Sequence, residues 1–321
     1  MTHSCLFTSK SPLFTGLDSR VAALISAGWA PRTRAAYATA VGRYSRFVNS
    51  FNLRPFPLEE QKILRFVAFL ASQNLTSATV ANYLSGLRAW ALALGGVEPD
   101  LWTPRVRLAV KAISRGDGPP KQVDPINYAL LRKILALLHF DRDNAMLASA
   151  ISLHYFACLR ASELCLDPVT GWAPLRSSIH FTSPRTMVYS VPTSKNAPKG
   201  FVAHIGCSGQ PVCAPCTMKC YLNNFPALPS SYLFATRGGA PLDYPSYNNH
   251  IKSLIGTLGL DPTRYSTHSL RAGAATQAAD SGLSHHDIQR LGRWRSDAYK
   301  IYLRPPPSSY AFFAPHLVTH H

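Results

Sequence analysis

Residues 267–304 read T-H-S-L-R-A-G-A-A-T-Q-A-A-D-S-G-L-S-H-H-D-I-Q-R-L-G-R-W-R-S-D-A-Y-K-I-Y-L-R, and this stretch carries the signals that organise the second half of the chain. Thr267 and Ser284 are favourable helix N-caps, because a hydroxyl oxygen accepts a hydrogen bond from an unpaired N–H group of the first turn. Gly282 and Gly292 are placed to end the two helices. The stretch therefore predicts two helices followed by a short final segment.

Four polar side chains of this stretch form a chemically coherent set. His268 and Arg271 are three residues apart and share one face of the first helix, and Trp294 and Tyr302 follow on the final segment. Arginine offers a planar fork that matches phosphate oxygens, histidine and tryptophan add donors, and tyrosine is an oxygen nucleophile. No acidic cluster accompanies them, which disfavours two-metal phosphoryl transfer. The set predicts attack of a tyrosine on a phosphodiester, with the developing charge stabilised by fixed donors.

The chain is long and strongly basic. Its 321 residues suffice for two domains of ordinary size. Lysine and arginine number 33 against 16 aspartate and glutamate, which gives a net charge of +17 and a pI of about 9.8. A globular chain this basic points to a polyanionic partner such as nucleic acid, although a basic surface can also serve solubility alone.

No membrane partner or secretory signal is expected. The N-terminus lacks the charged and apolar regions of a signal peptide, and the longest apolar run, residues 146–159, is too short to cross a bilayer. The seven cysteines are an odd number, which together with the missing signal predicts reduced thiols.

The first half of the chain predicts a tail followed by a small helical bundle. Residues 1–30 are expected to be the tail, and residues 31–114 form the bundle, with helix starts near Thr33, Pro57, Thr76 and Pro104. A grip on the DNA backbone is predicted for four arginines, Arg32, Arg34, Arg43 and Arg88. For any one of them, a solvated helix face is the plain alternative. Residues 115–125 are rich in Gly, Pro and charge and predict a linker.

The second domain is expected over residues 126–304 and ends in a tail, residues 305–321. It begins with apolar helical sequence, and C-L-R-A-S-E-L follows with Arg160 and Glu163. An ordinary Arg–Glu pair on a helix surface is the structural alternative for these two residues.

A β-rich insert interrupts the helices of the second domain. Residues 186–192 and 201–205 alternate as strands and flank a turn, T-S-K-N-A-P-K-G, that contains Lys195 and Lys199. The predicted fold class is therefore mainly α with a small β-sheet.

Four cysteines follow the insert with the spacing C-x5-C-x2-C-x3-C, at Cys207, Cys213, Cys216 and Cys220. Zinc is one interpretation, since C-x2-C is a known ligand pair. The crowding of the pairs into one loop, with Cys220 expected to open an apolar helix, favours buried or reactive thiols instead. We therefore expect no metal.

Taken together, these motifs resemble those of the tyrosine recombinases, the phage-integrase family. C-L-R-A-S-E-L matches the first catalytic block, H-S-L-R the second, L-G-R-W the third and Y-L-R the nucleophile block, and T-S-K-N matches the mobile β-hairpin lysine. Residues 31–114 resemble the family's helical core-binding domain. The resemblance implies a two-domain DNA clamp. The G-R-W-x-S form of the third block is most similar to recombinases of eukaryotic Crypton, DIRS and Ngaro-type mobile elements.

The resemblance also implies a mechanism and the role of each residue in it. Tyr302 attacks the scissile phosphate and forms a 3′-phosphotyrosine, while Arg160 and Arg271 hold the non-bridging oxygens. His268 assists proton transfer, and Lys195 protonates the leaving oxygen. The mechanism needs no metal, ATP or other cofactor.

The third block departs from the common family pattern. In most members the His or Trp directly follows the glycine, whereas Arg293 holds that place here and Trp294 comes one residue later. We assign the phosphate donor to Trp294 and keep Arg293 as the alternative.

The resemblance implies a site-specific recombinase or integrase that inserts a mobile element into double-stranded DNA. Such enzymes act as homo-oligomers, here expected as a tetramer on paired DNA sites, in the nucleus for a eukaryotic element and otherwise in the cytoplasm. A catalytically silent DNA-binding protein is the alternative. A type IB topoisomerase is a third reading, which the core-binding-like first domain disfavours.

Overall fold

The computed structural model describes residues 20–21, 23–94, 99–118, 122–194 and 197–303. The chain divides into two compact units, residues 1–121 and residues 122–321, and each unit is described by itself. In the described ranges, no helix is both long and apolar enough to cross a bilayer.

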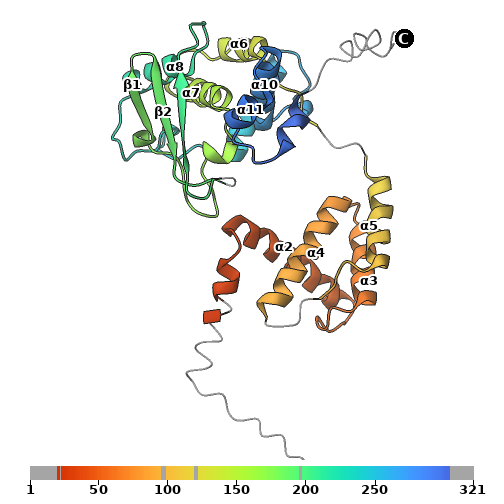
Figure 1. The fold of residues 1–321 in the computed structure, drawn as a ribbon. Coiled ribbons are helices and arrows are strands. Elements are labelled where there is room, and N and C mark those ends of the chain that lie inside the picture. The colour runs from red at the N-terminus through yellow and green to blue at the C-terminus, as the bar shows by residue number, and fades with distance from the viewer. Residues whose placement is uncertain (1–19, 22, 95–98, 119–121, 195–196, 304–321) are drawn as a thin grey trace, which may run out of the picture. The chain divides into compact units, whose positions relative to one another are not determined.

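The first unit is a bundle of α-helices (Figure 1). Its elements are α2 (Pro31–Ser50), α3 (Glu60–Ala71), α4 (Ser77–Ala93) and α5 (Pro104–Gly116). Helices α4 and α5 begin where the sequence predicted. The Thr76 and Thr103 hydroxyls cap them by accepting hydrogen bonds from backbone N–H groups in the first turn. Two predicted starts are wrong: α2 begins at Pro31, before Thr33, and α3 begins at Glu60, three residues after Pro57.

An aromatic and aliphatic core holds this bundle together. Tyr44 and Phe47 of α2 pack against Phe66 of α3, with ring centroids 5.2 and 5.3 Å from Phe66. Helices α2 and α4 approach closely at Gly86, where an added Cβ would lie 2.6 Å from the Ala40 Cβ. Glycine is therefore required at this crossing, because any side chain would push the two helices apart.

The second unit combines helices with a small sheet (Figure 1). Its elements are α6 (Tyr128–Ala136), α7 (Arg142–Phe156), η1 (Ala161–Glu163), η2 (Arg176–Ser178), β1 (Ile179–Ser183), β2 (Thr186–Val191), β3 (Phe201–Gly206), α8 (Ala214–Asn224), α9 (Tyr244–Thr257), η3 (Pro262–Arg264), α10 (Thr267–Asp280), α11 (His285–Leu291) and η4 (Asp297–Tyr302). The mainly α fold with a small sheet is confirmed.

The sheet is antiparallel in the order β1–β2–β3, with β2 in the centre. Met187 of β2 stands opposite Phe181 of β1 and Ile205 of β3. The side chains of Met187, Tyr189 and Val191 alternate into the core, as the period of a strand requires. The sequence predicted β2 and β3 as individual strands, and the structure adds β1.

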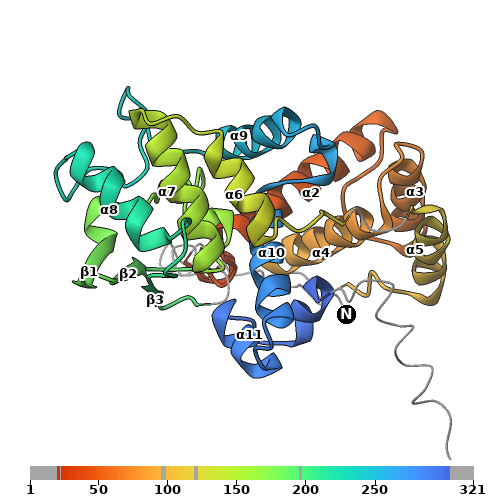
Figure 2. The ribbon, with the colours of Figure 1, turned by 90° about the horizontal axis from the view of Figure 1, so that it is seen from above.

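Helix α10 lies in the core of the second unit, packed beside α7 (Figures 1 and 2). Its cap is Ser266, whose hydroxyl accepts from the His268 N–H at 3.2 Å, so the predicted cap Thr267 is instead the first helical residue. At Gly273 a Cβ would lie 1.8 Å from the Ile126 carbonyl oxygen. The small residues of α10 therefore let it pack against the backbone that enters α6.

Candidate active site

The structure brings the phenol of Tyr302 to the imidazole of His268. Tyr302 Oη lies 2.7 Å from His268 Nε2, and the two rings meet edge to face at 5.2 Å. Tyr302 ends η4, and its carbonyl accepts from Thr276 Oγ1 at 2.7 Å. This second contact fastens η4 to α10, which carries His268, so the phenol is held by helix packing as well as by its own hydrogen bond.

The neighbouring Tyr299 has a different environment. Its side chain is only 3% exposed, and its Oη lies 3.0 Å from His285 Nδ1 on α11. Tyr302 is only half-buried. Of the two tyrosines on η4, Tyr302 is therefore the accessible one, and Tyr299 is part of the packing between η4 and α11.

Arg271 is a buried guanidinium at the centre of the site, with 1% of its surface exposed. Its Nη1 donates to the Cys158 carbonyl at 2.5 Å, and its Nη2 donates to the Gly292 carbonyl at 2.6 Å. These contacts join α10 to the end of α7 and to the end of α11. Because the two acceptors are backbone groups, the position of this guanidinium is fixed by the fold.

Arg160 lies just after α7, at the cap of η1. Its Nη1 donates to Glu163 Oε1 at 3.2 Å, and its backbone N–H donates to Glu163 Oε2 at 2.9 Å. Glu163 is 1% exposed and Arg160 is 21% exposed. The alternative of an ordinary surface pair is therefore wrong: the carboxylate is buried and holds a partly accessible arginine in place.

The end of α11 has an unusual backbone. The predicted start of this helix is confirmed, because Ser284 Oγ accepts from the Asp287 N–H at 3.1 Å. At the other end Gly292 has an ordinary negative φ, and Arg293 is the left-handed residue, with φ of +56°. Gly292 is still required, because a Cβ there would lie 1.8 Å from the Trp294 ring.

Hydrogen bonds of the Schellman type close this helix end. The Arg293 N–H donates to the Arg290 carbonyl at 3.1 Å, and the Trp294 N–H donates to the Gln289 carbonyl at 3.0 Å. A left-handed arginine is disfavoured by about 1 kcal/mol relative to glycine. Residues held in such a conformation often lie at functional sites.

The guanidinium of Arg293 turns toward the first block. Its Nη2 donates to Glu163 Oε2 and to the Cys158 carbonyl, each at 3.2 Å. The same group lies over the Phe201 ring of β3 at 4.1 Å. Glu163 therefore has two arginine partners, one from its own block and one from a segment 130 residues later in the chain.

Trp294 lies next to Tyr302, whereas Arg293 is directed at Glu163. The Arg271 guanidinium stacks over its ring at 4.2 Å, and the Tyr302 ring centroid is 5.6 Å away. Of the two third-block residues, Trp294 is thus the one that contacts the candidate nucleophile.

The environment sets the protonation of the Tyr302–His268 pair. Partial burial raises the pKa of Tyr302, and the charges of Arg271 and Arg160 oppose that rise. His268 is partly exposed to solvent. Burial of the rest of its ring lowers its pKa below 6.5, and the positive charges of Arg271 and Arg160 lower it further. At neutral pH the pair is a neutral phenol beside a neutral imidazole, which can accept the phenolic proton at Nε2.

A second histidine lies behind the site and was missed from the sequence. His154 is buried in α7, with Nδ1 3.1 Å from Tyr247 Oη. Burial lowers its pKa to about 3, and the charges of Arg271 and His268 lower it as well. This imidazole therefore stays neutral and supports the core without carrying a charge into it.

The lysine predicted as the general acid, Lys195, lies outside the described residues. Its rival Lys199 is exposed and precedes β3. The structure therefore leaves the lysine assignment as a prediction.

The predicted DNA-gripping arginines lie in the first unit, on α2 and α4. Arg32, Arg34 and Arg88 are exposed, and Arg43 is half-buried and donates to Gln73 Oε1 at 2.8 Å. Arg32 and Arg43 are eleven residues apart and therefore lie about 20° from each other around the helix, whereas Arg34 lies about 160° from Arg32. Arg32 and Arg43 share a face, and Arg34 does not.

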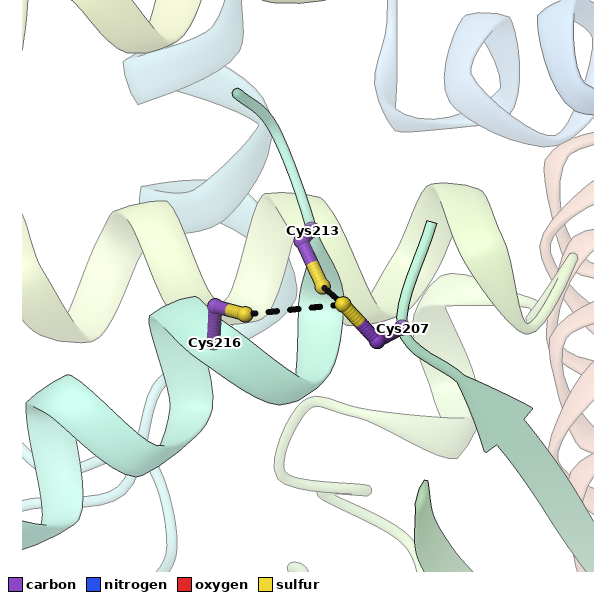
Figure 3. A group of neighbouring side chains, drawn as sticks. All are labelled: Cys207, Cys213 and Cys216. Atoms are coloured by element: carbon purple, nitrogen blue, oxygen red, sulfur yellow. Dashed lines mark hydrogen bonds between the residues drawn. The ribbon is translucent and has the colours of Figure 1, made fainter. Parts of the chain in front are cut away.

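Three of the four clustered cysteines meet in the structure. The Sγ atoms of Cys207, Cys213 and Cys216 all lie within 4.8 Å of one another (Figure 3). The expectation for Cys220 is wrong: Cys213 caps α8, and Cys220 lies further along it, where its Sγ accepts from the Asn224 side chain at 3.6 Å.

Two comparisons with family models agree with this architecture. Residues 17–90 match the N-terminal SAM-like domain of phage integrases, and residues 215–305 match the phage integrase family. No curated protein sequence matches the chain.

Solved structures of DNA recombinases share the fold. The Tn1549 transposon integrase in complex with transposon right end DNA superposes with a TM-score of 0.61 at 15% identity, over 89% of this chain and 99% of that one. XerH site-specific recombinase bound to palindromic difH substrate gives a TM-score of 0.63 at 16% identity, over 88% and 79%. A lambda integrase dimer bound to a COC′ core site gives 0.59 at 17% identity, over 93% and 82%.

The fold is that of the two-domain tyrosine recombinases. Two segments of the chain, residues 17–90 and residues 215–305, match domains of the phage integrase family.

Proposed function

We propose that this protein is an active site-specific recombinase that cuts and rejoins double-stranded DNA through a 3′-phosphotyrosine. The observation that carries the proposal is the 2.7 Å contact between Tyr302 Oη and His268 Nε2, beside the buried guanidinium of Arg271. A DNA-binding protein without chemistry needs neither an accessible phenol nor a base positioned to take its proton.

In the proposed first step, the oxygen of Tyr302 attacks the scissile phosphorus. His268 Nε2 takes the phenolic proton as the new O–P bond forms. The bond from phosphorus to the 5′-oxygen breaks, and Lys195 supplies the proton that leaves with this oxygen as a 5′-hydroxyl. The DNA strand is then linked to Tyr302 through its 3′-phosphate.

Charge accumulates on the non-bridging oxygens during this attack, and in this proposal Arg160 and Arg271 stabilise it. Arg271 is oriented by two backbone carbonyls, and Arg160 is oriented by the buried carboxylate of Glu163. Donors that are fixed in advance need little reorganisation in the transition state, which is the main source of their effect.

We assign the third-block role to Trp294. This side chain contacts Tyr302 and Arg271, which supports a role for its N–H group as a phosphate donor. Arg293 is proposed as a positioning residue, because its guanidinium is directed at Glu163 and at backbone carbonyls.

Rejoining reverses the chemistry. The 5′-hydroxyl of a second strand attacks the phosphotyrosine, and Tyr302 leaves with the proton that His268 returns. Each phosphodiester that is broken is replaced by another ester of similar energy, so the cycle consumes no ATP.

We further propose that the reaction integrates a mobile element of the Crypton, DIRS or Ngaro kind, in a tetramer on paired sites in the nucleus. The G-R-W-x-S form of the third block supports this affiliation. One protein of the same fold is a transposon integrase by its printed name, which is compatible with such a role.

In this proposal the first unit grips the DNA backbone. Arg32 and Arg43 present two guanidinium groups on one face of α2, and Arg88 adds a third from α4. Contacts of this kind bind phosphates without reading the base sequence.

The test is covalent capture from a library. Duplexes with a randomised core and a nick beside each candidate cleavage position are incubated with the protein, and the nick lets the short leaving strand diffuse away. The expected result is an adduct that resists detergent and yields a phosphotyrosyl peptide after digestion. The Tyr302→Phe variant is the control and should enrich the same DNA without the covalent link.

If the wild type, like Tyr302→Phe, enriched specific DNA but formed no adduct, the proposed chemistry would be contradicted. That result would favour the catalytically silent DNA-binding protein.

A further inference from the structure

Three cysteine side chains converge at the junction between the sheet and α8 (Figure 3). Cys207 directly follows β3, Cys213 caps α8, and Cys216 lies in the first turn of that helix. Their Sγ atoms point toward one another from these positions, with Cys207 3.4 Å from Cys213 and 3.9 Å from Cys216. Cys207 and Cys213 belong to the segment that joins β3 to α8, and Cys216 belongs to α8 itself.

The spacing of the sulfur atoms matches a tetrahedral thiolate site. Zinc holds thiolates at about 2.3 Å, so two sulfurs on one tetrahedral ion lie about 3.8 Å apart. The separations in the structure, 3.4 and 3.9 Å, are close to this value. A disulfide requires sulfurs about 2.05 Å apart, so none of these three thiols is joined to another. Little movement would therefore be needed to accept an ion.

The local charge environment favours a thiolate at this junction. Cys213 stands at the N-terminus of α8, where unpaired N–H groups stabilise negative charge.

The three thiols lie close enough together to share one cation. Three sulfurs this close cannot all ionise without a cation between them. A divalent ion supplies that charge, and each thiol then loses its proton to solvent as the metal–sulfur bond forms.

We propose that Cys207, Cys213 and Cys216 bind one zinc ion, with water in the fourth coordination position. Thiolate ligands in a tetrahedral arrangement select zinc over magnesium or calcium, which prefer oxygen. Cys207 is half-buried, Cys213 is buried and Cys216 is exposed, so the ion can enter from the Cys216 side.

Cys220 is excluded from the ligand set and is the matched control. It lies one turn beyond Cys216 on α8 and is also exposed, but it is not among the three thiols that converge. Its sulfur is instead in contact with the Asn224 side chain. Replacing it tests the effect of losing an exposed cysteine from the same helix.

The ion would act structurally. It would connect the end of β3 to the start of α8, which packs against α7, the helix that leads to Arg160. A metal link at this point holds the β2–β3 hairpin to the helical core. The inference does not depend on the proposed recombinase activity.

The experiment uses the full chain, purified with a thiol reductant, and adds zinc or cobalt(II) alone. Metal analysis after dialysis should find one zinc per chain. Cobalt(II) should give the thiolate-to-metal charge-transfer and tetrahedral ligand-field bands. Cys207→Ser, Cys213→Ser and Cys216→Ser should each weaken zinc binding by more than about tenfold, and Cys220→Ser should bind like the wild type.

A second measurement separates metal loss from unfolding. Zinc should raise the unfolding temperature of the wild type and of Cys220→Ser, because it binds only the folded form, and circular dichroism without metal should show all four variants folded. Failure of the reduced wild type to bind zinc, or cobalt spectra without thiolate bands, would overturn the proposal. Equal loss in Cys220→Ser and Cys213→Ser would overturn the three-thiolate assignment.

Discussion

Arg293 donates to the Glu163 carboxylate at 3.2 Å, and this contact joins the third block of the site to the first. Glu163 also orients Arg160, so a single buried carboxylate holds two guanidinium groups from distant segments. Removing one partner of such a group leaves a buried charge that is poorly compensated. The geometry of Arg160, which we propose to contact the phosphate, therefore depends on a carboxylate that is also held by Arg293, which we propose as a positioning residue.

The first prediction concerns the nucleophile. Tyr302→Phe should bind DNA as the wild type does but form no covalent adduct, because it lacks the attacking oxygen. Tyr299→Phe should still form the adduct and instead lose some stability, since its hydroxyl contacts His285 in the packing between η4 and α11. Adduct gels and thermal unfolding measure the two effects. Adduct formation by Tyr302→Phe would refute the assignment.

The second prediction concerns the arginine clamp. Arg160→Ala and Arg271→Ala should each slow single-turnover cleavage on the order of 100- to 1000-fold, with a much smaller loss of DNA affinity. Arg271→Ala should also lower the unfolding temperature more than Arg160→Ala, because Arg271 is buried and bonded to two carbonyls. Equal losses in affinity and cleavage would show that these arginines only grip phosphate.

The third prediction separates Trp294 from Arg293. Trp294→Phe keeps an aromatic ring against Arg271 but removes the N–H donor, so cleavage should fall while the unfolding temperature changes little. Arg293→Ala should lower both, because Glu163 loses a partner.

A backbone control sharpens this comparison. Arg293→Gly should be more stable than Arg293→Ala by about 1 kcal/mol, because glycine adopts the left-handed conformation at φ of +56° without strain. A cleavage loss confined to Arg293→Ala and absent from Trp294→Phe would move the donor role to Arg293.

The fourth prediction concerns pH. The pKa of His268 lies below its ordinary value of 6.5, and the proposed base is the neutral form. The single-turnover rate should therefore persist as pH falls to 6.5 and decline only below it, as His268 becomes protonated. His154 does not interfere, since burial holds its pKa near 3. A midpoint above 6.5 in the acidic limb would contradict the neutral-base assignment.

The fifth prediction concerns the leaving group. Lys195→Ala should be slow on normal DNA, because a 5′-alkoxide leaves poorly without a proton. A 5′-bridging phosphorothiolate has a better leaving group, so it should largely restore the rate of this variant. Lys199→Ala is the matched control and should show no such rescue. An Lys195→Ala defect that sulfur substitution leaves unchanged would make Lys195 a positioning residue.

Several features of the site followed from the sequence because their signals are local. The spacing of His268 and Arg271 places both on α10, and Ser284 caps α11, because helix geometry and capping are set within one or two turns. The alternating residues of β2 predicted its strand for the same reason. The motif order then indicated which side chains belong to one site.

Other features were decided by packing between distant segments. Gly292 ends α11 as the sequence predicted, but packing decides the conformation there: the Trp294 ring occupies the space beside Gly292, and the left-handed residue is Arg293. Likewise, the loop spacing of the cysteines argued against a metal, whereas the path from β3 into α8 brings three of the thiols together.

The family resemblance, the mainly helical fold and the identity of the candidate nucleophile block all followed from the sequence alone, since each depends on residue types at short spacing. The tertiary structure alone decided that Tyr302 and not Tyr299 is accessible, and that Glu163 is shared by two arginines. The physical reason is that burial and the contact between residues 130 positions apart depend on how helices pack, which local periodicity does not encode.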